Sequence, residues 1–431
     1  MPPIASLSFF SMNILFLADN FPPERNAQAS RVYERACYWV RWGHQVTVLT
    51  CFPNFPEGKL YSGYRNRWRQ VEEMDGIRVV RLKTFIAPNA GRVLRIVDFL
   101  SYMVSAFLAG LFERRPDVVA ATSPQFFAAV AGCGLAIGRR RPFVLELSDL
   151  WPESIVAVGA MKPNMGLRWL EKLELVLYRR AARIVALTTS FKQNLTRRGI
   201  DGRKIEVVIN GVDLSRYAPR PRDRDLAARC CLPENDFTVG YIGTHGMAHA
   251  LENVLEAAAL LRDQAVRFLF VGAGAERRNL IAEASRRQLR NVSFVPAQAK
   301  EMMPAVWSLC DVALVHLKDT PLFETVIPSK IFEAMAMGKP VLLASPEGEA
   351  SRIVKWDNTG LHVPAQHPEE LAAAVLFLKE NPDFTRELSR RSLVAAPTYS
   401  RERQARDMLA VLESAVQGIP ETMRAATVRE R

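Results

Sequence analysis

The chain has 431 residues, 49% of them apolar and 24% charged, which is the composition of a folded protein of two or three domains and excludes a largely disordered chain. Its six cysteines form no C-x-x-C pair, so they predict neither a zinc site nor a disulfide framework and fit a reducing cytosol. The net charge of +12 lies in residues 12–218, with 30 Lys and Arg against 18 Asp and Glu, while residues 219–431 hold 27 of each. This asymmetry indicates an anionic partner or simply a soluble basic surface.

The first half of the chain alternates apolar runs with helical patterns. A helix is predicted at 28–42, ending at Gly43, and strands are predicted at 13–18, 45–50, 77–82, 117–122, 142–147 and 183–188. The apolar stretch 96–112 lies between two of these strands, where a doubly wound sheet needs a crossover helix. Its length also approaches that of a membrane span. A buried crossover helix, a helix that presents Phe99, Met103 or Phe107 to lipid, and a spanning helix therefore remain open.

The second half repeats this alternation, with strands predicted at 237–243, 267–274, 292–296, 311–317 and 340–345. The boundary falls in the Pro- and Arg-rich stretch around 209–225. We therefore predict an N-terminal extension (1–11), a first domain (12–218) on which a terminal helix (401–416) packs back, a second domain (219–400) and a disordered tail (417–431). Two doubly wound parallel sheets in tandem are expected to place a ligand cleft at the carboxyl ends of their strands.

The stretch "ETVIPSKIFEAMAMGKPV" (324–341) carries two carboxylates and a Pro-Ser-Lys step before an apolar helix. Ser329 is expected to cap the helix, and the first backbone N–H groups are expected to be unpaired. Adding the Lys330 ammonium makes this end suited to a diphosphate, with Glu333 placed to accept hydrogen bonds from a ribose. An ordinary capped helix with a solvated Lys and Glu fits the same spacing.

Two glycine-bearing loops follow predicted strands. In "GYIGTHGMAHALE", Gly243 and Gly246 let the backbone approach a ligand closely, and Thr244, His245 and His249 offer hydrogen-bond donors. In "LFVGAGAE", Gly272 and Gly274 are too few for a dinucleotide fingerprint, so the pattern by itself favours a structural turn over a phosphate site.

With these motifs in this order, the chain resembles the retaining, sugar-nucleotide-dependent glycosyltransferases of family 4, which have the GT-B fold of two facing Rossmann-like domains. The resemblance spans roughly residues 12–416. It is similar in particular to a bacterial group that includes fucosamine transferases of O-antigen and capsule synthesis. The motifs that carry this are "FPPE", "PNFPEGK", "LSDLWPES", "INGVD", "GTHGMAHALE" and "FETVIPSKIFEAMAMGKPV".

The resemblance implies that the second domain binds a UDP-sugar, plausibly of an N-acetylated deoxyhexosamine, and the first a polyprenyl-diphosphate-linked saccharide. The implied donor residues are Glu333 at the ribose, Gly243 and Thr244 beside the diphosphate, and the backbone near Val295 and Pro296 at the base. The predicted donor site also includes the residues singled out above from the motifs themselves, which are His249, Gly272, Gly274, Ser329 and Lys330. The implied mechanism is transfer with retention, in which the departing diphosphate itself accepts the proton of the acceptor.

The sequence also departs from the family pattern. Thr244 and His249 stand where many relatives have an Arg and a Lys, so Lys330 is expected to supply the missing charge. The glutamate that relatives place before the helix corresponds to Thr325, with Glu324 displaced by one, so the contact with the donor sugar falls to Glu324 or Thr325. A first-domain histidine is absent, Ser123 and Pro124 standing near its place. Catalytic roles are therefore expected for Glu324, Lys330 and Asp149, with acceptor contacts from Glu146 and Asp149.

Three further expectations concern partners. "DRD" (223–225) lies in a charged linker, and the histidines lack ligand spacing, so no metal and no cofactor are expected. "YRNRWRQ" (64–70) is a single Arg-aromatic loop, so nucleic acid is not expected. The basic half predicts peripheral, salt-sensitive attachment to the inner face of the cytoplasmic membrane. The alternatives are a UDP-sugar epimerase and a non-enzymatic basic scaffold for membrane or nucleic acid.

Overall fold

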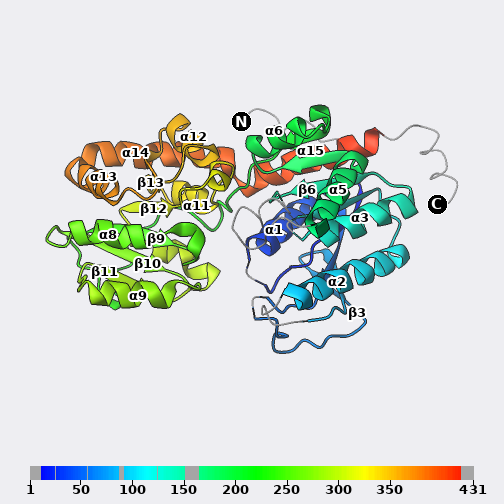
Figure 1. Ribbon diagram of the computed structural model, residues 1–431, viewed down its shortest axis with the longest axis horizontal. Coiled ribbons are helices and arrows are strands. Elements are labelled where there is room, and N and C mark those ends of the chain that lie inside the picture. The colour runs from blue at the N-terminus through cyan, green and yellow to red at the C-terminus, as the bar shows by residue number, and fades with distance from the viewer. Residues whose placement is uncertain are drawn as a thin grey trace. The chain divides into compact units, whose positions relative to one another are not determined.

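The computed structural model describes residues 11–24, 26–55, 57–86, 92–123, 125–150 and 165–418. Contacts divide the chain into unit 1, residues 1–209 with 404–431, and unit 2, residues 210–403 (Figure 1). The predicted N-terminal extension and C-terminal tail lie outside the described residues, apart from Ser11, Gln417 and Gly418. Each unit is a sheet covered by helices.

The division at 209/210 differs from the predicted boundary at 218/219. Residues after 209 pair with the end of unit 2: the Val212 N–H donates to the Tyr399 carbonyl at 2.9 Å, and the Arg401 guanidinium donates to the Asn210 side chain at 2.7 Å. The segment lacks periodicity in the sequence, so its pairing partner some 190 residues away could not be predicted.

Unit 1 holds an eight-stranded sheet in the order β3-β4-β2-β1-β5-β6-β7-β8. All neighbours are parallel except β3 and β4, which form a hairpin through Asp75 and Gly76, both at positive φ. The elements are β1 (Asn13–Leu17), α1 (Ala27–Arg41), β2 (Gln45–Cys51), β3 (Arg69–Met74), β4 (Ile77–Leu82), α2 (Arg92–Phe112), β5 (Val118–Thr122), α3 (Phe126–Arg139), β6 (Phe143–Leu147), α5 (Met165–Arg180), β7 (Arg183–Ala186), α6 (Thr189–Arg197), β8 (Ile205–Val207) and α15 (Arg401–Gln417).

The central strands of unit 1 are buried on both faces. Alternate residues such as Ile14, Phe16 and Val48 share one core with α1 and α15, and the Trp39 indole of α1 donates to the Ala405 carbonyl of α15 at 2.8 Å. The other face carries α2, α3 and α5, which Figure 1 shows together and which contact one another through α3. Helices on both faces are what a parallel sheet requires.

Unit 2 holds a six-stranded parallel sheet in the order β11-β10-β9-β12-β13-β14. Its strands and longer helices are α7 (Arg224–Arg229), β9 (Phe237–Ile242), α8 (Glu252–Leu260), β10 (Val266–Val271), α9 (Arg277–Arg286), β11 (Val292–Val295), α10 (Met303–Ser308), β12 (Val312–His316), α11 (Lys330–Ala336), β13 (Val341–Ala344), α12 (Glu349–Trp356), β14 (Gly360–Val363), α13 (Pro368–Glu380) and α14 (Pro382–Ala395). Short 3-10 turns include η2 (Met247–His249) and η4 (Pro321–Glu324).

The strand order of unit 2 reverses between β9 and β12. The chain runs from β9 outward through β10 and β11, then returns to β12 on the opposite side of β9. In open α/β sheets, the carboxyl ends of the two strands at such a reversal flank a ligand crevice. The loops after β9 and β12 are therefore the first place to look for a site. In unit 1 the same reversal lies between β1 and β5.

Candidate functional site

The Lys330 side chain reaches from the first turn of α11 to the loop after β9. Its Nζ lies 3.9 Å from the ring centroid of Tyr241 and has no hydrogen-bond partner, although the atom is shielded from solvent. Burial lowers the pKa of this ammonium to about 7, and the nearby Glu333 opposes the shift. A buried ammonium that lies on an aromatic face and makes no hydrogen bond is poised to receive an anion.

Gly243 is the residue that admits this ammonium. Its φ is +143°, and a Cβ there would lie 2.7 Å from Lys330 Nζ. The Tyr241 hydroxyl donates to the Thr244 carbonyl at 2.8 Å and so holds the following turn, while the Thr244 side chain is exposed. The structure thus brings Gly243, Thr244 and Lys330 together at the reversal point, at the carboxyl end of β9.

Gly272 and Gly274 serve the packing of two loops. A Cβ on Gly272 would lie 1.9 Å from the Gly243 carbonyl oxygen, and one on Gly274 would lie 2.3 Å from the His245 carbonyl oxygen. The Gly272 N–H donates to the Val295 carbonyl at 3.1 Å, so Val295 joins the same cluster, and Pro296 after it is exposed. Glycine is therefore needed at both positions so that the loop after β10 can pack against the loop after β9.

The helix start differs from the prediction. The Ser329 side chain makes no capping hydrogen bond, and the N–H groups of Ile331 and Phe332 donate to the Pro328 and Ser329 carbonyls at 3.1 Å each. These tight i→i+3 bonds consume donors that were expected to be unpaired. The positive charge at this end of α11 therefore comes from the Lys330 side chain more than from the backbone.

His249 and His316 join the loops after β9 and β12. The ring nitrogen Nδ1 of His249 lies 3.3 Å from the His316 carbonyl oxygen, and Nδ1 of His316 lies 2.7 Å from the His249 carbonyl oxygen. A carbonyl oxygen only accepts, so both Nδ1 atoms carry the proton and both Nε2 atoms are acceptors. Burial lowers both pKa values to about 4, with Lys330 adding to the shift. At neutral pH, His249 therefore does not replace a missing cation.

His245 lies beneath the same loop. Its side chain is fully buried against the rings of Tyr241, Phe270 and Phe294, and neither ring nitrogen has a hydrogen-bond partner. Burial lowers its pKa to about 4, helped by the charges of Arg277 and Lys330. Sequence reasoning assigned no role to Tyr241 or His316, because in the sequence they read as strand residues without motif spacing. His245 was expected to offer a hydrogen-bond donor to a ligand, but its ring is fully buried beneath the loop.

Glu333 is positioned by two aromatic side chains. The Trp307 indole donates to Glu333 Oε2 at 3.3 Å, and Tyr217, itself buried, also donates to the carboxylate. Burial raises the pKa of Glu333, although the hydrogen bonds and the charges of Lys300 and Lys330 counter it. The residue as a whole is half-buried, and a carboxylate has lone pairs for more than these two donors, so further donors such as sugar hydroxyls can bind to it.

Glu324 lies at the end of η4 and is exposed. Its backbone, not its side chain, makes the tight contact of this region: a Cβ on Gly348 would lie 2.1 Å from the Glu324 carbonyl oxygen. The hydroxyl of Thr325 donates to the Leu322 carbonyl at 2.8 Å. Because that hydroxyl is used within its own turn, the free carboxylate of Glu324 is the better candidate of the two for a ligand.

On unit 1, Glu146 is a structural residue rather than an acceptor contact. Its carboxylate is fully buried and bonds to Arg35 at 2.6 and 2.9 Å and to Arg31 at 3.1 Å. Burial alone would raise the pKa of Glu146, but the two guanidinium groups hold it at about 2. An acceptor cannot reach a carboxylate enclosed in this way. Asp149 is half-buried just after β6, and the Ser123 hydroxyl donates to its carbonyl at 3.4 Å.

Glu24 explains why two of the quoted motifs occur together. Its carboxylate accepts from the backbone N–H groups of Asn54 at 2.9 Å, Phe55 at 2.8 Å and Phe21 at 3.2 Å. It thereby ties "FPPE" (21–24) to "PNFPEGK" (53–59) at the carboxyl ends of β1 and β2. Burial raises its pKa to about 7 despite these donors. The sequence shows both motifs but not this link.

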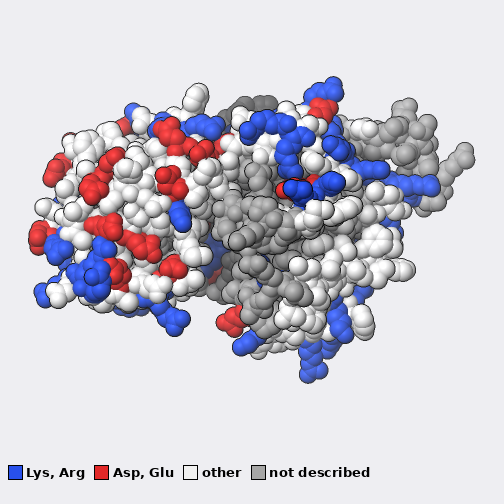
Figure 2. Space-filling view, viewed as in Figure 1, with Lys and Arg blue, Asp and Glu red and all other residues white. Residues whose placement is uncertain are grey.

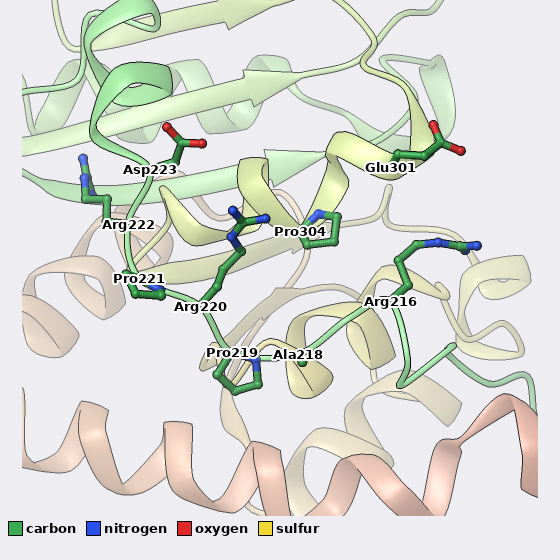
Figure 3. Close-up of a pocket in the computed structure, with 9 residues that line it drawn as sticks. All are labelled: Arg216, Ala218, Pro219, Arg220, Pro221, Arg222, Asp223, Glu301 and Pro304. Atoms are coloured by element: carbon green, nitrogen blue, oxygen red, sulfur yellow. The ribbon is translucent and has the colours of Figure 1, made fainter.

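A surface pocket of about 750 Å³ also lies in unit 2, along the segment 216–223 with Glu301 and Pro304 (Figure 3). Figure 3 shows its arginines pointing in different directions, and Arg222 is already bonded to the Leu309 carbonyl at 2.7 Å. This pocket is lined by none of the residues predicted to bind the donor. Within the described ranges, no group of three or more His, Cys, Asp or Glu lies together, and Asp223 of "DRD" caps α7 through the Leu226 N–H.

Comparison with known proteins gives matches over both units. Residues 28–216 match the family described as Glycosyltransferase Family 4, and residues 236–381 match Glycosyl transferases group 1. The chain is 27% identical over 396 residues to the putative colanic acid biosynthesis glycosyl transferase WcaI of Escherichia coli, covering 89% of this chain and 96% of that one. It is 27% identical to the probable glycosyltransferase WbjE of Pseudomonas aeruginosa, covering 64% and 69%.

Solved structures share the fold. A sucrose-phosphate synthase from Thermosynechococcus elongatus has a TM-score of 0.76 at 18% identity, covering 95% of this chain and all of that one. The Anabaena protein HepE in complex with UDP-glucose has a TM-score of 0.71 at 18% identity, covering 94% and 100%. These likenesses confirm the predicted architecture of two Rossmann-like α/β domains.

Proposed function

Because this chain belongs to glycosyltransferase family 4 and has the GT-B fold, we propose that it transfers a sugar from a UDP-sugar to a polyprenyl-diphosphate-linked saccharide, with retention. It is a glycosyltransferase of bacterial polysaccharide synthesis, a role that the names of its relatives WcaI and WbjE support. For the sugar itself we keep the N-acetylated deoxyhexosamine, such as a fucosamine, that the motif resemblance implies.

One observation carries the donor assignment: the buried Lys330 ammonium, which has no hydrogen-bond partner, lies against Gly243 and the Tyr241 ring. A nucleoside diphosphate supplies the anion that this cation lacks. The HepE structure holds UDP-glucose, which supports a uridine nucleotide as the donor carrier. In this proposal Glu333 accepts from the ribose hydroxyls, while the backbone at Val295 and Pro296 meets the base.

The chemistry of the remaining polar side chains suggests which part of the donor or acceptor each one contacts. Thr244 offers a hydroxyl and backbone beside the diphosphate. His249 accepts hydrogen bonds at neutral pH, because its Nδ1 proton is directed to the His316 carbonyl, so it suits a sugar hydroxyl better than a phosphate oxygen. Glu324 is the candidate for the donor sugar, and Asp149 is the candidate on the acceptor side.

The proposed reaction needs little from a protein base. The bond between the anomeric carbon and the diphosphate oxygen breaks, and the acceptor oxygen bonds to the same face of that carbon. The acceptor proton passes to the departing diphosphate oxygen. The task of the protein is to stabilise the charge that develops on the leaving group, and Lys330 is placed for it. No metal is invoked.

We also propose that the protein works at the inner face of the cytoplasmic membrane without spanning it. A lipid-linked acceptor resides there, and the excess of 12 positive charges in residues 12–218 favours an anionic surface. In Figure 2 the surface of unit 2 mixes both signs of charge.

A mass-spectrometric transfer assay tests the function. UDP- and dTDP-sugars are offered with and without polyprenyl-diphosphate acceptors, to the wild type, Lys330→Ala and the control Lys339→Ala at the other end of α11. Product formation that needs both substrates and Lys330, but not Lys339, is the expected result. Turnover of a UDP-sugar without any acceptor would identify an epimerase instead.

A further inference from the structure

Helix α2 is apolar on its outward face as well as its inward one. Among the described residues it is the one helix long and apolar enough to cross a membrane, over Leu94–Phe112. Its exposed apolar side chains recur at helical spacing along one side, ending in Phe112, which is 88% exposed. They are Leu94, Ile96, Val97, Leu100, Val104, Leu108 and Phe112.

The inward face fixes α2 to unit 1. The buried Tyr102 hydroxyl donates to the Leu49 carbonyl of β2 at 2.8 Å. A Cβ on Gly110 would lie 2.4 Å from the Leu135 side chain of α3, and one on Gly134 of α3 would lie 3.4 Å from Phe107. α2 is therefore the crossover helix of the sheet. Phe99, Met103 and Phe107, the residues of the lipid-facing alternative, are all partly buried.

Helix α5 carries a second outward stripe. Met165, Trp169, Leu173 and Val176 are exposed at intervals of three or four residues, with Trp169 at 67%. Exposed cations flank this stripe, and the Lys172 ammonium lies 5.3 Å from the Trp169 ring centroid. A basic helix with an outward Trp and aliphatic residues is the pattern of an interfacial helix.

The two stripes belong to one layer. α3 packs between α2 and α5 on the same face of the sheet and adds Ile137, itself exposed. In Figure 2 the surface over α2 and α3 is mostly uncharged, with Lys and Arg at its margins. Just after α2, the exposed Arg114 and Arg115 follow the buried Glu113, which is itself paired with Arg69 and Arg78. Apolar stripes with cationic margins match a bilayer of anionic lipid, which offers hydrocarbon behind negative headgroups.

We propose that the outward faces of α2 and α5 form the surface by which this protein lies on an anionic membrane. The inference rests on the proposed function, because a lipid-linked acceptor requires unit 1 to stay at the bilayer. Leu94, Val97, Val104, Leu108 and Phe112 enter the headgroup boundary from α2, and Trp169 enters it from α5. The inward contacts of α2 remain in place, so the helix does not cross the bilayer.

Co-sedimentation of the full chain with vesicles tests the surface. Vesicles of phosphatidylcholine are compared with vesicles that also contain phosphatidylglycerol, at low and high salt. The variant Val104→Ser with Leu108→Ser, both 51% exposed, is matched by the control Val394→Ser with Leu260→Ser, which are 68% and 57% exposed in unit 2. The wild type and the control are expected to pellet with anionic vesicles and to be released by high salt.

The α2 variant is expected to bind about tenfold more weakly, because two aliphatic side chains no longer enter the boundary. Trp169→Ala is expected to weaken binding as well. The proposal fails if the wild type does not pellet at low salt, if the α2 variant binds like the control, or if only detergent extracts the protein. Unchanged binding of Trp169→Ala overturns the two-helix surface. A wild-type dimer in sedimentation velocity that the α2 variant abolishes assigns the face to a second copy.

UDP titration calorimetry on the same preparations separates the two proposals. UDP binding without vesicle binding rejects the membrane surface and leaves the proposed function standing. Vesicle binding without UDP binding rejects the proposed donor and leaves the membrane surface standing.

Discussion

Replacing Lys330 by alanine is expected to abolish a proton uptake that accompanies donor binding. The free ammonium has a pKa lowered to about 7 by burial, whereas a bound diphosphate favours the charged form and raises that pKa. Between the two values the complex holds one proton more than the free protein. Binding therefore weakens as the pH rises above about 7 and is insensitive to this group below it.

The size of the effect follows from the pKa. One pH unit above about 7, only about a tenth of the free protein carries the ammonium, so donor binding takes up about 0.9 proton. Over this range the affinity falls up to about tenfold per pH unit. Loss of the contact to the developing diphosphate costs roughly 2–4 kcal/mol, or a turnover reduced about 30- to 1000-fold.

Calorimetry with UDP-glucose measures the uptake directly, since its diphosphate has no proton to lose near neutral pH. Titration in buffers of different ionisation enthalpy gives the number of protons from the slope of the observed enthalpy. Wild-type protein should show uptake above pH 7, and Lys330→Ala should show none there, with Lys339→Ala behaving as wild type.

Two outcomes would refute this reasoning. Absence of any buffer dependence would mean that Lys330 holds the same charge with and without donor. Uptake confined to lower pH and retained in Lys330→Ala would assign the proton to His245 or His249, whose pKa values lie at about 4 and would be raised by the anion.

Three further predictions test neighbouring residues. Glu333→Ala should weaken UDP binding about 10- to 100-fold, the value of charged hydrogen bonds to a ribose, and unchanged affinity in calorimetry would reject the ribose assignment. Gly243→Ala should strongly weaken donor binding in a folded protein, because its Cβ would displace the Lys330 ammonium, which lies only 2.7 Å away, whereas a Cβ on Gly246 would make ordinary contact with Thr244 at 3.6 Å, so Gly246→Ala should have a much smaller effect. Glu146→Gln should lower the free energy of unfolding by about 3–5 kcal/mol, because two buried guanidinium groups lose their counter-charge. In the wild type, urea titrations should show this contribution intact above the ordinary carboxyl pKa of 4.5 and fading as the pH falls toward about 2.

Much of the fold could be predicted from local patterns. The runs at 13–18, 45–50 and 77–82 are β1, β2 and β4, and the helix predicted over 28–42 is α1 (Ala27–Arg41), with Gly43 at a φ of +90° two residues beyond its end. Buried parallel strands can be recognised in the sequence as continuous apolar runs, because apolar residues must fill both of their faces. The edge strand β3, "RQVEEM", has no buried residue and was therefore missed, since its place depends on pairing with β4.

The candidate site, too, could be predicted from the sequence only in part. Its charged members, Lys330 and Glu333, were found because their spacing at a helix start is visible along the chain. That Lys330 lies over Tyr241, that His249 and His316 exchange hydrogen bonds, and that Glu146 is enclosed by Arg31 and Arg35 depend on strand order, which joins residues 67 to 115 positions apart. Sequence pattern determines which residues can carry charge to the end of a strand. The packing of the sheet decides which of them remain unpaired, and an unpaired buried cation is what distinguishes the candidate ligand site from a structural ion pair.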